Sequence, residues 1–272
     1  MLRSTPSLTG QGGVKPLGEH GVELPEQIRA VIFDTDGVVT RTADVHAQAW
    51  ARLFDAYLAD RAATTGEAFV PFSAADYLHY VDGKPRYDGV ESFLASRSIV
   101  LPRGEPTDAP ETLTLCGLGN RKNGYFHQHL RDHGVEPFES TLRFAAALRG
   151  AGIATGVISA SENCAEILES AGATTFFDVR VDGLDANRLG LPGKPDPAIF
   201  IEAARRLEVE PAEAAIVEDA ISGVEAGRAG GFGLVIGVDR VGQADALAHH
   251  GADLVVNDLS ELSVSPTTRR SG

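Results

Sequence analysis

The sequence predicts an α/β fold with a parallel sheet, helices on both faces of that sheet, and a mostly helical segment inserted after the first strand. From about residue 136 onward, helical and short apolar segments alternate. This alternation is typical of parallel strands joined by helical crossovers. Residues 41–133, between the first apolar strand and this array, carry helical spacing instead.

The elements follow in order. The first strand ends at Asp34, and helical spacing then covers 43–59, 86–97 and 111–133, interrupted by joints rich in Pro and Gly such as 101–106. The alternating array consists of helices and strands in turn: helix 141–149, strand 153–158, helix 162–170, strand 175–181, helix 198–207, strand 214–217, helix 221–229, strand 233–238, helix 244–249 and strand 253–256.

This pattern divides the chain into four parts. We expect residues 27–40 and 134–264 to form the core and residues 41–133 to form a helical cap, with candidate hinges at 37–41 and 133–137. Residues 1–26 and 265–272 are rich in small and polar residues, so we expect flexible tails there.

Composition excludes several classes of partner. The formal net charge of −14 argues against a nucleic acid or an anionic membrane, because both require a basic surface. The sequence contains no run of about 18 apolar residues, which is the length needed to span a membrane. The two cysteines, Cys116 and Cys164, lack the spacing of a metal site and fit a reducing compartment. We therefore expect a cytoplasmic protein, working as a monomer on a small molecule.

The first strand ends in two carboxylates, Asp34 and Asp36, followed by Gly37. On an extended chain, side chains at i and i+2 point the same way, and open α/β sheets bind ligands at the carboxyl ends of their strands. Two crowded carboxylates repel each other unless a cation lies between them, so the pair predicts a hard divalent metal such as Mg²⁺. The alternative is an acidic turn that happens to follow a buried strand.

Four short stretches make the chain resemble the haloacid dehalogenase superfamily of phosphotransferases over residues 29–258 or so. In chain order they are Asp34-Thr35-Asp36-Gly37, Val157-Ile158-Ser159-Ala160-Ser161, Gly193-Lys194-Pro195-Asp196-Pro197 and Ile216-Val217-Glu218-Asp219. The resemblance implies a Rossmann-like core, Mg²⁺ as the cofactor and an aspartyl-phosphate formed during the reaction.

Residue roles follow from this resemblance. Asp34 is expected to be the nucleophile, and Asp36 the general acid and base toward the leaving and entering oxygens. Asp219, with Glu218 beside it, is expected to join Asp34 and the backbone carbonyl of Asp36 as the metal ligands; both could instead cap the next helix. Lys194, on a stiff loop, would hold the phosphate and Asp34, whereas most lysines are solvated surface residues.

The segment after strand 153–158 is a candidate phosphate cradle. Ser159, Ala160 and Ser161 open the helix that contains Asn163, and free N–H groups with a hydroxyl at a helix start bind phosphate. We expect Ser159 to take part in catalysis and all four to bind substrate. The alternative is that a serine here serves as a helix cap.

The predicted cap resembles that of the β-phosphoglucomutase-like subfamily. Thr42 and His46 lie one helix turn apart and match positions beside the acid/base aspartate, and Trp50 follows one turn later on the same face. Arg86 resembles the arginine that holds a phosphate distant from the nucleophile, which a guanidinium does by bidentate bonding. Lys122 resembles a cap lysine that contacts substrate oxygens. Structural roles remain open for His46 and Trp50.

The resemblance therefore implies interconversion of β-D-glucose 1-phosphate and glucose 6-phosphate through glucose 1,6-bisphosphate, because a second anion site suits a sugar with two phosphates. The alternative is a phosphatase that hydrolyses small sugar or polyol phosphates. A third possibility is a binding protein that has lost activity, but such proteins usually lose the nucleophile or a metal carboxylate, and this chain keeps them.

Overall fold

The computed structural model describes residues 22–66 and 68–264. Its centre is a parallel sheet of six strands in the order β4-β3-β2-β5-β6-β7, which confirms the predicted fold class. The strands are β2 (Ala30–Asp34), β3 (Ala154–Ile158), β4 (Val179–Val181), β5 (Ala214–Glu218), β6 (Leu234–Val238) and β7 (Leu254–Val256). Because all pairs are parallel, the carboxyl ends of these strands meet at one edge.

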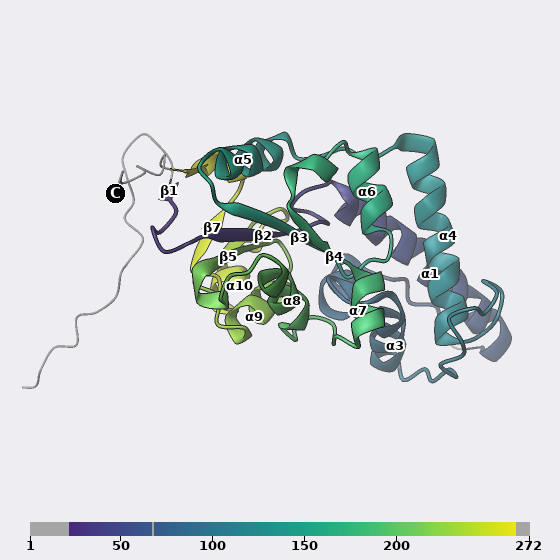
Figure 1. Cartoon of the computed structure of the whole chain (residues 1–272). Helices are drawn as coiled ribbons and strands as arrows, with labels where there is room; N and C mark the ends of the chain where they lie inside the picture. The colour runs from purple at the N-terminus through teal and green to yellow at the C-terminus, as the bar shows by residue number, and fades with distance from the viewer. Residues whose placement is uncertain (1–21, 67, 265–272) are drawn as a thin grey trace, which may run out of the picture.

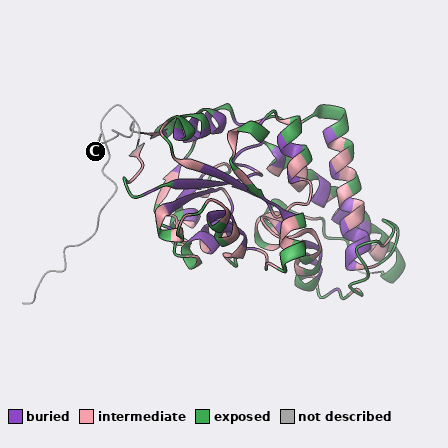
Figure 2. Cartoon of the chain, viewed as in Figure 1, coloured by how far each residue is buried: buried purple, intermediate pink, exposed green. Residues whose placement is uncertain are grey.

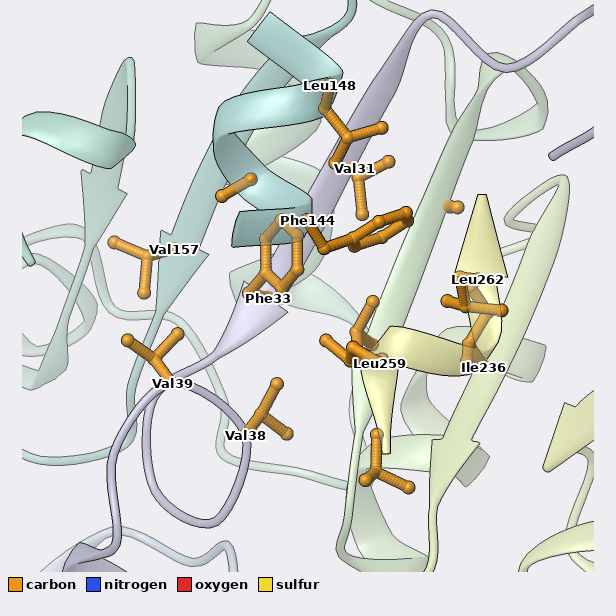
Figure 3. Packing of buried hydrophobic residues seen from close by; sticks show 14 of the residues in the cluster. Val31, Phe33, Val38, Val39, Phe144, Leu148, Val157, Ile236, Leu259 and Leu262 are labelled. Atoms are coloured by element: carbon orange, nitrogen blue, oxygen red, sulfur yellow. The ribbon is translucent and has the colours of Figure 1, made fainter. Parts of the chain in front are cut away.

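Helices cover both faces of the sheet, so its central strands β2, β5 and β6 are buried along their whole length (Figure 2). On one face, Val31 and Phe33 of β2 pack against Phe144 and Leu148 (Figure 3). On the other face, Ile32 of β2 belongs to a hydrophobic cluster that includes Phe200 and Val224. The first face carries α5 (Glu139–Gly150) and α6 (Cys164–Ser170); the second carries α8 (Ala198–Arg206), α9 (Ile221–Ala229) and α10 (Ala244–His249).

The helical insertion has a hydrophobic core of its own beside the sheet (Figure 1). Trp50 stacks on Phe54 with ring centroids 5.2 Å apart, and Phe93 lies against Phe54 at 4.1 Å. Its elements are α1 (Thr42–Thr65), α2 (Ala74–Asp76), the π-helix η1 (Tyr77–Val81), α3 (Arg86–Ser96) and α4 (Leu115–His133). These separate clusters fit the division into core and cap, which stays a prediction.

Local hydrogen bonds set helix boundaries that the sequence did not predict. The helix predicted from residue 111 begins at Leu115, since the Thr114 hydroxyl caps it by accepting from the N–H of Gly117. Helix α7 (Gly183–Leu189) was not predicted; Asp182 caps its start by accepting two backbone N–H groups. The strand predicted at 175–181 is shorter, because 3₁₀-helix η2 (Thr174–Phe176) precedes β4.

The predicted N-terminal tail is wrong for part of its length. Residues Val22–Glu23 form β1, which pairs in parallel with β8 (Leu262–Ser263), so the backbone hydrogen bonds of this segment come from the other end of the chain. Leu24 also packs against the core. Residues 1–21 and 265–272, the rest of the two predicted tails, lie outside the described residues. Among 22–66 and 68–264, no helix combines the length and the apolar character that a membrane crossing requires.

Candidate active site

A buried lysine joins two strand ends at the carboxyl edge of the sheet. Lys194 Nζ donates to Asp34 Oδ1 at 2.5 Å and also to the carboxylate of Glu218, so it bridges the ends of β2 and β5. Burial would lower the pKa of Lys194, but the two carboxylates outweigh it and raise that pKa. Burial raises the pKa of Asp34, and Lys194 only partly offsets this effect. The predicted meeting of Asp34 and Lys194 is confirmed.

Asp34, Glu218 and Asp219 form a cluster of carboxylates that could hold a metal ion. One oxygen from each lies within 4.8 Å of the others. Burial and neighbouring carboxylates raise the pKa of Asp219, so bringing these groups together without a cation is unfavourable. Purely carboxylate oxygen donors suit a hard divalent cation. The donor set of this cluster therefore fits such an ion.

Gly37 makes room for this cluster. Its φ of +83° is in the left-handed region that favours glycine, and a Cβ there would lie 1.7 Å from Asp219 Oδ2. The turn after β2 can therefore approach Asp219 closely because residue 37 has no side chain.

The carboxylate of Asp36 is not in the cluster, which corrects the expectation that it points the same way as Asp34. Strand β2 ends at Asp34 and the chain turns, so the alternation of an extended strand no longer applies. The N–H of Asp36 donates to Asp34 Oδ2 at 2.9 Å. As a metal residue, Asp36 is left with its backbone carbonyl, which stays a prediction.

Asp36 instead faces the insertion. Its carboxylate accepts from the Thr42 hydroxyl, and it lies 3.4 Å from His46 Nε2 and 3.4 Å from Ser159 Oγ. Burial would raise the pKa of Asp36, but His46 and Thr42 lower it to about 2. The side chain is thus ionised and connects the core to α1.

Lys122 lies behind His46 in the insertion. Its ammonium contacts His46 Nδ1 and lies 5.0 Å from the ring of Trp50 and 5.1 Å from that of Phe126. Burial lowers the pKa of Lys122 to about 7, with Asp36 acting in the opposite direction. Burial and the nearby Lys122 also lower the pKa of His46. Thr42 and His46 thus contact Asp36, and Lys122 contacts His46; the roles of all three residues stay predictions.

The segment after β3 differs from the predicted cradle. Helix α6 begins at Cys164, two residues later than expected, and hydroxyls within the segment accept from two of its N–H groups. Ser161 N–H donates to Ser159 Oγ at 3.0 Å, and Asn163 N–H donates to Ser161 Oγ at 3.1 Å. Those two N–H groups already have partners. Asn163 also donates to Asn123 of α4 at 2.8 Å, which links this segment to the insertion.

Arg86 has a carboxylate partner in the core. Its guanidinium donates to Glu162, which follows the Ser159–Ser161 segment. Glu162 also accepts from Asn187 of α7 at 2.9 Å. The Nε of Arg86 is buried without a hydrogen-bond partner among the described residues. The sequence predicted an anion at Arg86, but not that a residue of this chain would supply one.

A single pocket brings the predicted residues together from both parts of the chain. Thr42 and Ser159 do not line this pocket, but the hydroxyls of both donate to the carboxylate of Asp36, which does. The predicted residues in its wall are Asp34, Asp36, His46, Trp50, Arg86, Lys122, Ala160, Ser161, Asn163, Lys194, Glu218 and Asp219.

Sequence reasoning missed several residues in this wall: Tyr77, Asp82, Asn123, Glu162 and Asn187. Burial raises the pKa of Asp82 to about 6, with Tyr77 opposing through a hydrogen bond. A usable signal existed for both Asp82 and Glu162, since Asp82 lies four residues before Arg86 and Glu162 directly follows Ser161.

Comparisons with known proteins agree with this geometry. A family model described as a haloacid dehalogenase-like hydrolase matches residues 28–231. A β-phosphoglucomutase of Mycobacterium bovis is 51% identical over 243 residues, which cover 88% of this chain and 93% of that protein. A crystal structure of β-phosphoglucomutase from Clostridium difficile is 25% identical with a TM-score of 0.66, covering 87% of this chain and 93% of that one. A trehalose-phosphate phosphatase of Mycobacterium leprae is 37% identical over 138 residues, which cover 49% of this chain and 30% of that protein.

Proposed function

The chain belongs to the haloacid dehalogenase-like hydrolase family, and we propose that it is a β-phosphoglucomutase. The reaction would interconvert β-D-glucose 1-phosphate and glucose 6-phosphate through glucose 1,6-bisphosphate. The observation that carries this proposal is the pair of cations in the wall of one pocket. Lys194 lies beside Asp34 in the core, and Arg86 enters from the insertion. A sugar with two phosphates needs two such positions.

In the proposed reaction Asp34 is the nucleophile. An oxygen of Asp34 attacks phosphorus, and the bond from phosphorus to the sugar oxygen breaks. Asp36, which is ionised at rest, takes a proton from the sugar hydroxyl that accepts a phosphoryl group from Asp34, and it gives that proton to the leaving oxygen when Asp34 next takes up a phosphoryl group. The hydrogen bond from the backbone N–H of Asp36 holds the Asp34 carboxylate beside the backbone of Asp36. Lys194 reduces the repulsion between the carboxylate and the incoming phosphoryl group.

Mg²⁺ is the cofactor that we propose for the carboxylate cluster. Asp34 and Asp219 would hold it with Glu218 beside them, and the backbone carbonyl of Asp36 would complete the protein ligands. When bound, the ion would neutralise charge between the nucleophile and the phosphoryl group.

The insertion would act as a cap that selects the substrate. Thr42, His46 and Lys122 would orient Asp36 toward the sugar oxygens, and Arg86 would hold the phosphate that is not reacting. After one transfer the bisphosphate would turn over in the pocket and present its other phosphate to Asp34. The joints 37–41 and 133–137 would then open and close the cap.

A coupled assay tests the proposal. Purified protein with β-glucose 1-phosphate, Mg²⁺ and a trace of glucose 1,6-bisphosphate is followed for glucose 6-phosphate and, in parallel, for free phosphate. A mutase forms glucose 6-phosphate without stoichiometric phosphate release. The alternative, a phosphatase for small sugar or polyol phosphates, releases phosphate and forms no glucose 6-phosphate.

The Arg86→Ala variant tests the second anion site in the same assay. Removing a buried charged hydrogen bond costs about 2–5 kcal/mol, so the variant should lose most of its isomerisation. Arg52→Ala is the matched control, because Arg52 is an arginine of the insertion that bonds to Gln128 and does not line the pocket. An unchanged rate for Arg86→Ala would reject the distal phosphate role.

A further inference from the structure

The carboxylate of Glu162 is bonded to Arg86, the arginine to which the proposed function assigns the distal phosphate. The bond from Arg86 to Glu162 connects the first turn of α3 in the insertion to the segment after β3 in the core. Both side chains are largely shielded, with 17% and 31% of their surfaces exposed. The contact lies in the wall of the pocket, so any anion that reaches Arg86 meets a carboxylate already there.

Glu162 has a second partner that can hold it when Arg86 is taken away. Asn187 Nδ2 donates to Glu162 Oε1 at 2.9 Å, and this bond uses the oxygen that Arg86 does not contact. The Glu162 side chain also keeps 31% of its surface exposed, so water can solvate the oxygen that Arg86 would release. Displacing this carboxylate therefore leaves no buried charge unpaired.

Arg86 has unused capacity for an anion. Its Nε is buried and has no hydrogen-bond partner among residues 22–66 and 68–264, while its guanidinium lies 5.0 Å from the ring centroid of Tyr87. A guanidinium binds a phosphate best through two parallel N–H donors. One bond to Glu162 leaves this second donor unsatisfied, and a phosphate with several acceptor oxygens could satisfy both.

We propose that Glu162 is a specificity-determining residue of the distal subsite: it holds Arg86 until a phosphate dianion displaces it. This inference rests on the proposed function, since that function places the non-reacting phosphate at Arg86. A dianion interacts with Arg86 more strongly than a single carboxylate does, so it can displace Glu162, whereas a hydroxyl cannot. Glu162 thereby makes entry to the subsite depend on the charge of the ligand, and each ligand that binds must first break the Arg86–Glu162 bond.

The test is a binding titration with glucose 6-phosphate. It uses the full chain carrying Asp34→Asn, so that no phosphoryl group can be transferred. Into this parent we introduce Glu162→Gln, which keeps the size of the side chain and its bond to Asn187 but removes the charge that competes for Arg86. Glu166→Gln is the matched control. It also removes one negative charge and one contact with the insertion, the contact of Glu166 with His127, but Glu166 does not line the pocket. Arg86→Ala completes the set.

The proposal predicts that Glu162→Gln binds glucose 6-phosphate about fivefold more tightly than the parent, which matches the upper range of a partly shielded ion pair. Unphosphorylated glucose should gain no such advantage, and Glu166→Gln should leave both affinities unchanged. Circular dichroism melting checks that all variants fold.

Three results would overturn the proposal, and they are distinguishable. If Arg86→Ala weakens binding but Glu162→Gln does not tighten it, the distal subsite stands and Glu162 does not compete there. A Glu162→Gln variant that binds more weakly would instead mean that Glu162 positions Arg86. If Arg86→Ala binds as tightly as the parent, the subsite of the proposed function is wrong and the role of Glu162 falls with it.

Discussion

Lys122→Met should change how the stability of the protein depends on pH. Lys122 is 4% exposed, and burial lowers its pKa to about 7 from an ordinary value of 10.5. Between these values the unfolded chain binds one proton more than the folded chain at this residue. Stability contributed by Lys122 therefore rises with pH through this window, because an uncharged amine is easier to bury.

The size of the effect follows from the width of the window. One pKa unit corresponds to about 1.4 kcal/mol, so the contribution of Lys122 to the free energy of unfolding should rise by about 2 kcal/mol between pH 7 and pH 9. Methionine has a similar volume and no charge. The free energy of unfolding of the variant, relative to that of the parent, should therefore fall by about 2 kcal/mol between pH 7 and pH 9. The lowered pKa of His46 keeps its own titration below this range.

Urea unfolding of the parent and of Lys122→Met at pH 7, 8 and 9 measures this difference directly. Taking the difference between the two proteins removes the contribution of all groups that titrate alike in both. A difference in unfolding free energy that stays constant from pH 7 to pH 9 would show that Lys122 keeps an ordinary pKa, and the account of a buried Lys122 beside His46 would be wrong.

Two other substitutions give sharp outcomes. Lys194→Met should abolish phosphoryl transfer and lower the free energy of unfolding at pH 7 by about 3–5 kcal/mol, since it leaves two buried carboxylates without their ammonium. Lys84→Met is the control, because the Lys84 ammonium bonds to a serine hydroxyl, and it should change the free energy of unfolding little. Equal losses of unfolding free energy for both variants in urea would contradict this prediction. Gly37→Ala should weaken the affinity for Mg²⁺ at least tenfold, because its Cβ would displace Asp219. Gly172→Ala has a similar φ of +65° and open space around it, so it controls for backbone strain in a calorimetric Mg²⁺ titration; equal Mg²⁺ affinities for the two variants would reject the steric account.

The sequence predicted the sheet well because its strands are short apolar runs between helical segments. Ala214–Glu218 and Leu234–Val238 lie within a residue of their predicted bounds. The end of the first of these strands places Glu218 beside Asp34, the end of β2. Parallel pairing explains this success, since residues at the carboxyl ends of neighbouring strands meet whatever their separation in the chain. The pairing of β1 with β8 had no such pattern, because two-residue strands show no periodicity.

Side-chain direction and contacts across the pocket could not be predicted in the same way. Asp36 follows the last residue of β2, where the turn and not the strand sets its direction, and so it faces Thr42. The bond from Arg86 to Glu162 depends on how the insertion sits against the core, which no local pattern encodes. The π-helix at Tyr77–Val81 likewise has no sequence period that marks it, although it precedes Asp82 in the pocket.

Asp34 should carry the phosphoryl group during the reaction. The direct measurement is to incubate the protein with Mg²⁺ and glucose 1,6-bisphosphate, quench it rapidly, trap the acyl phosphate with borohydride and map the labelled peptide by mass spectrometry. We predict reduction of residue 34 in the parent and none in Asp34→Asn. Labelling at any other residue, or an Asp34→Asn variant that still forms glucose 6-phosphate at the parental rate, would contradict the account.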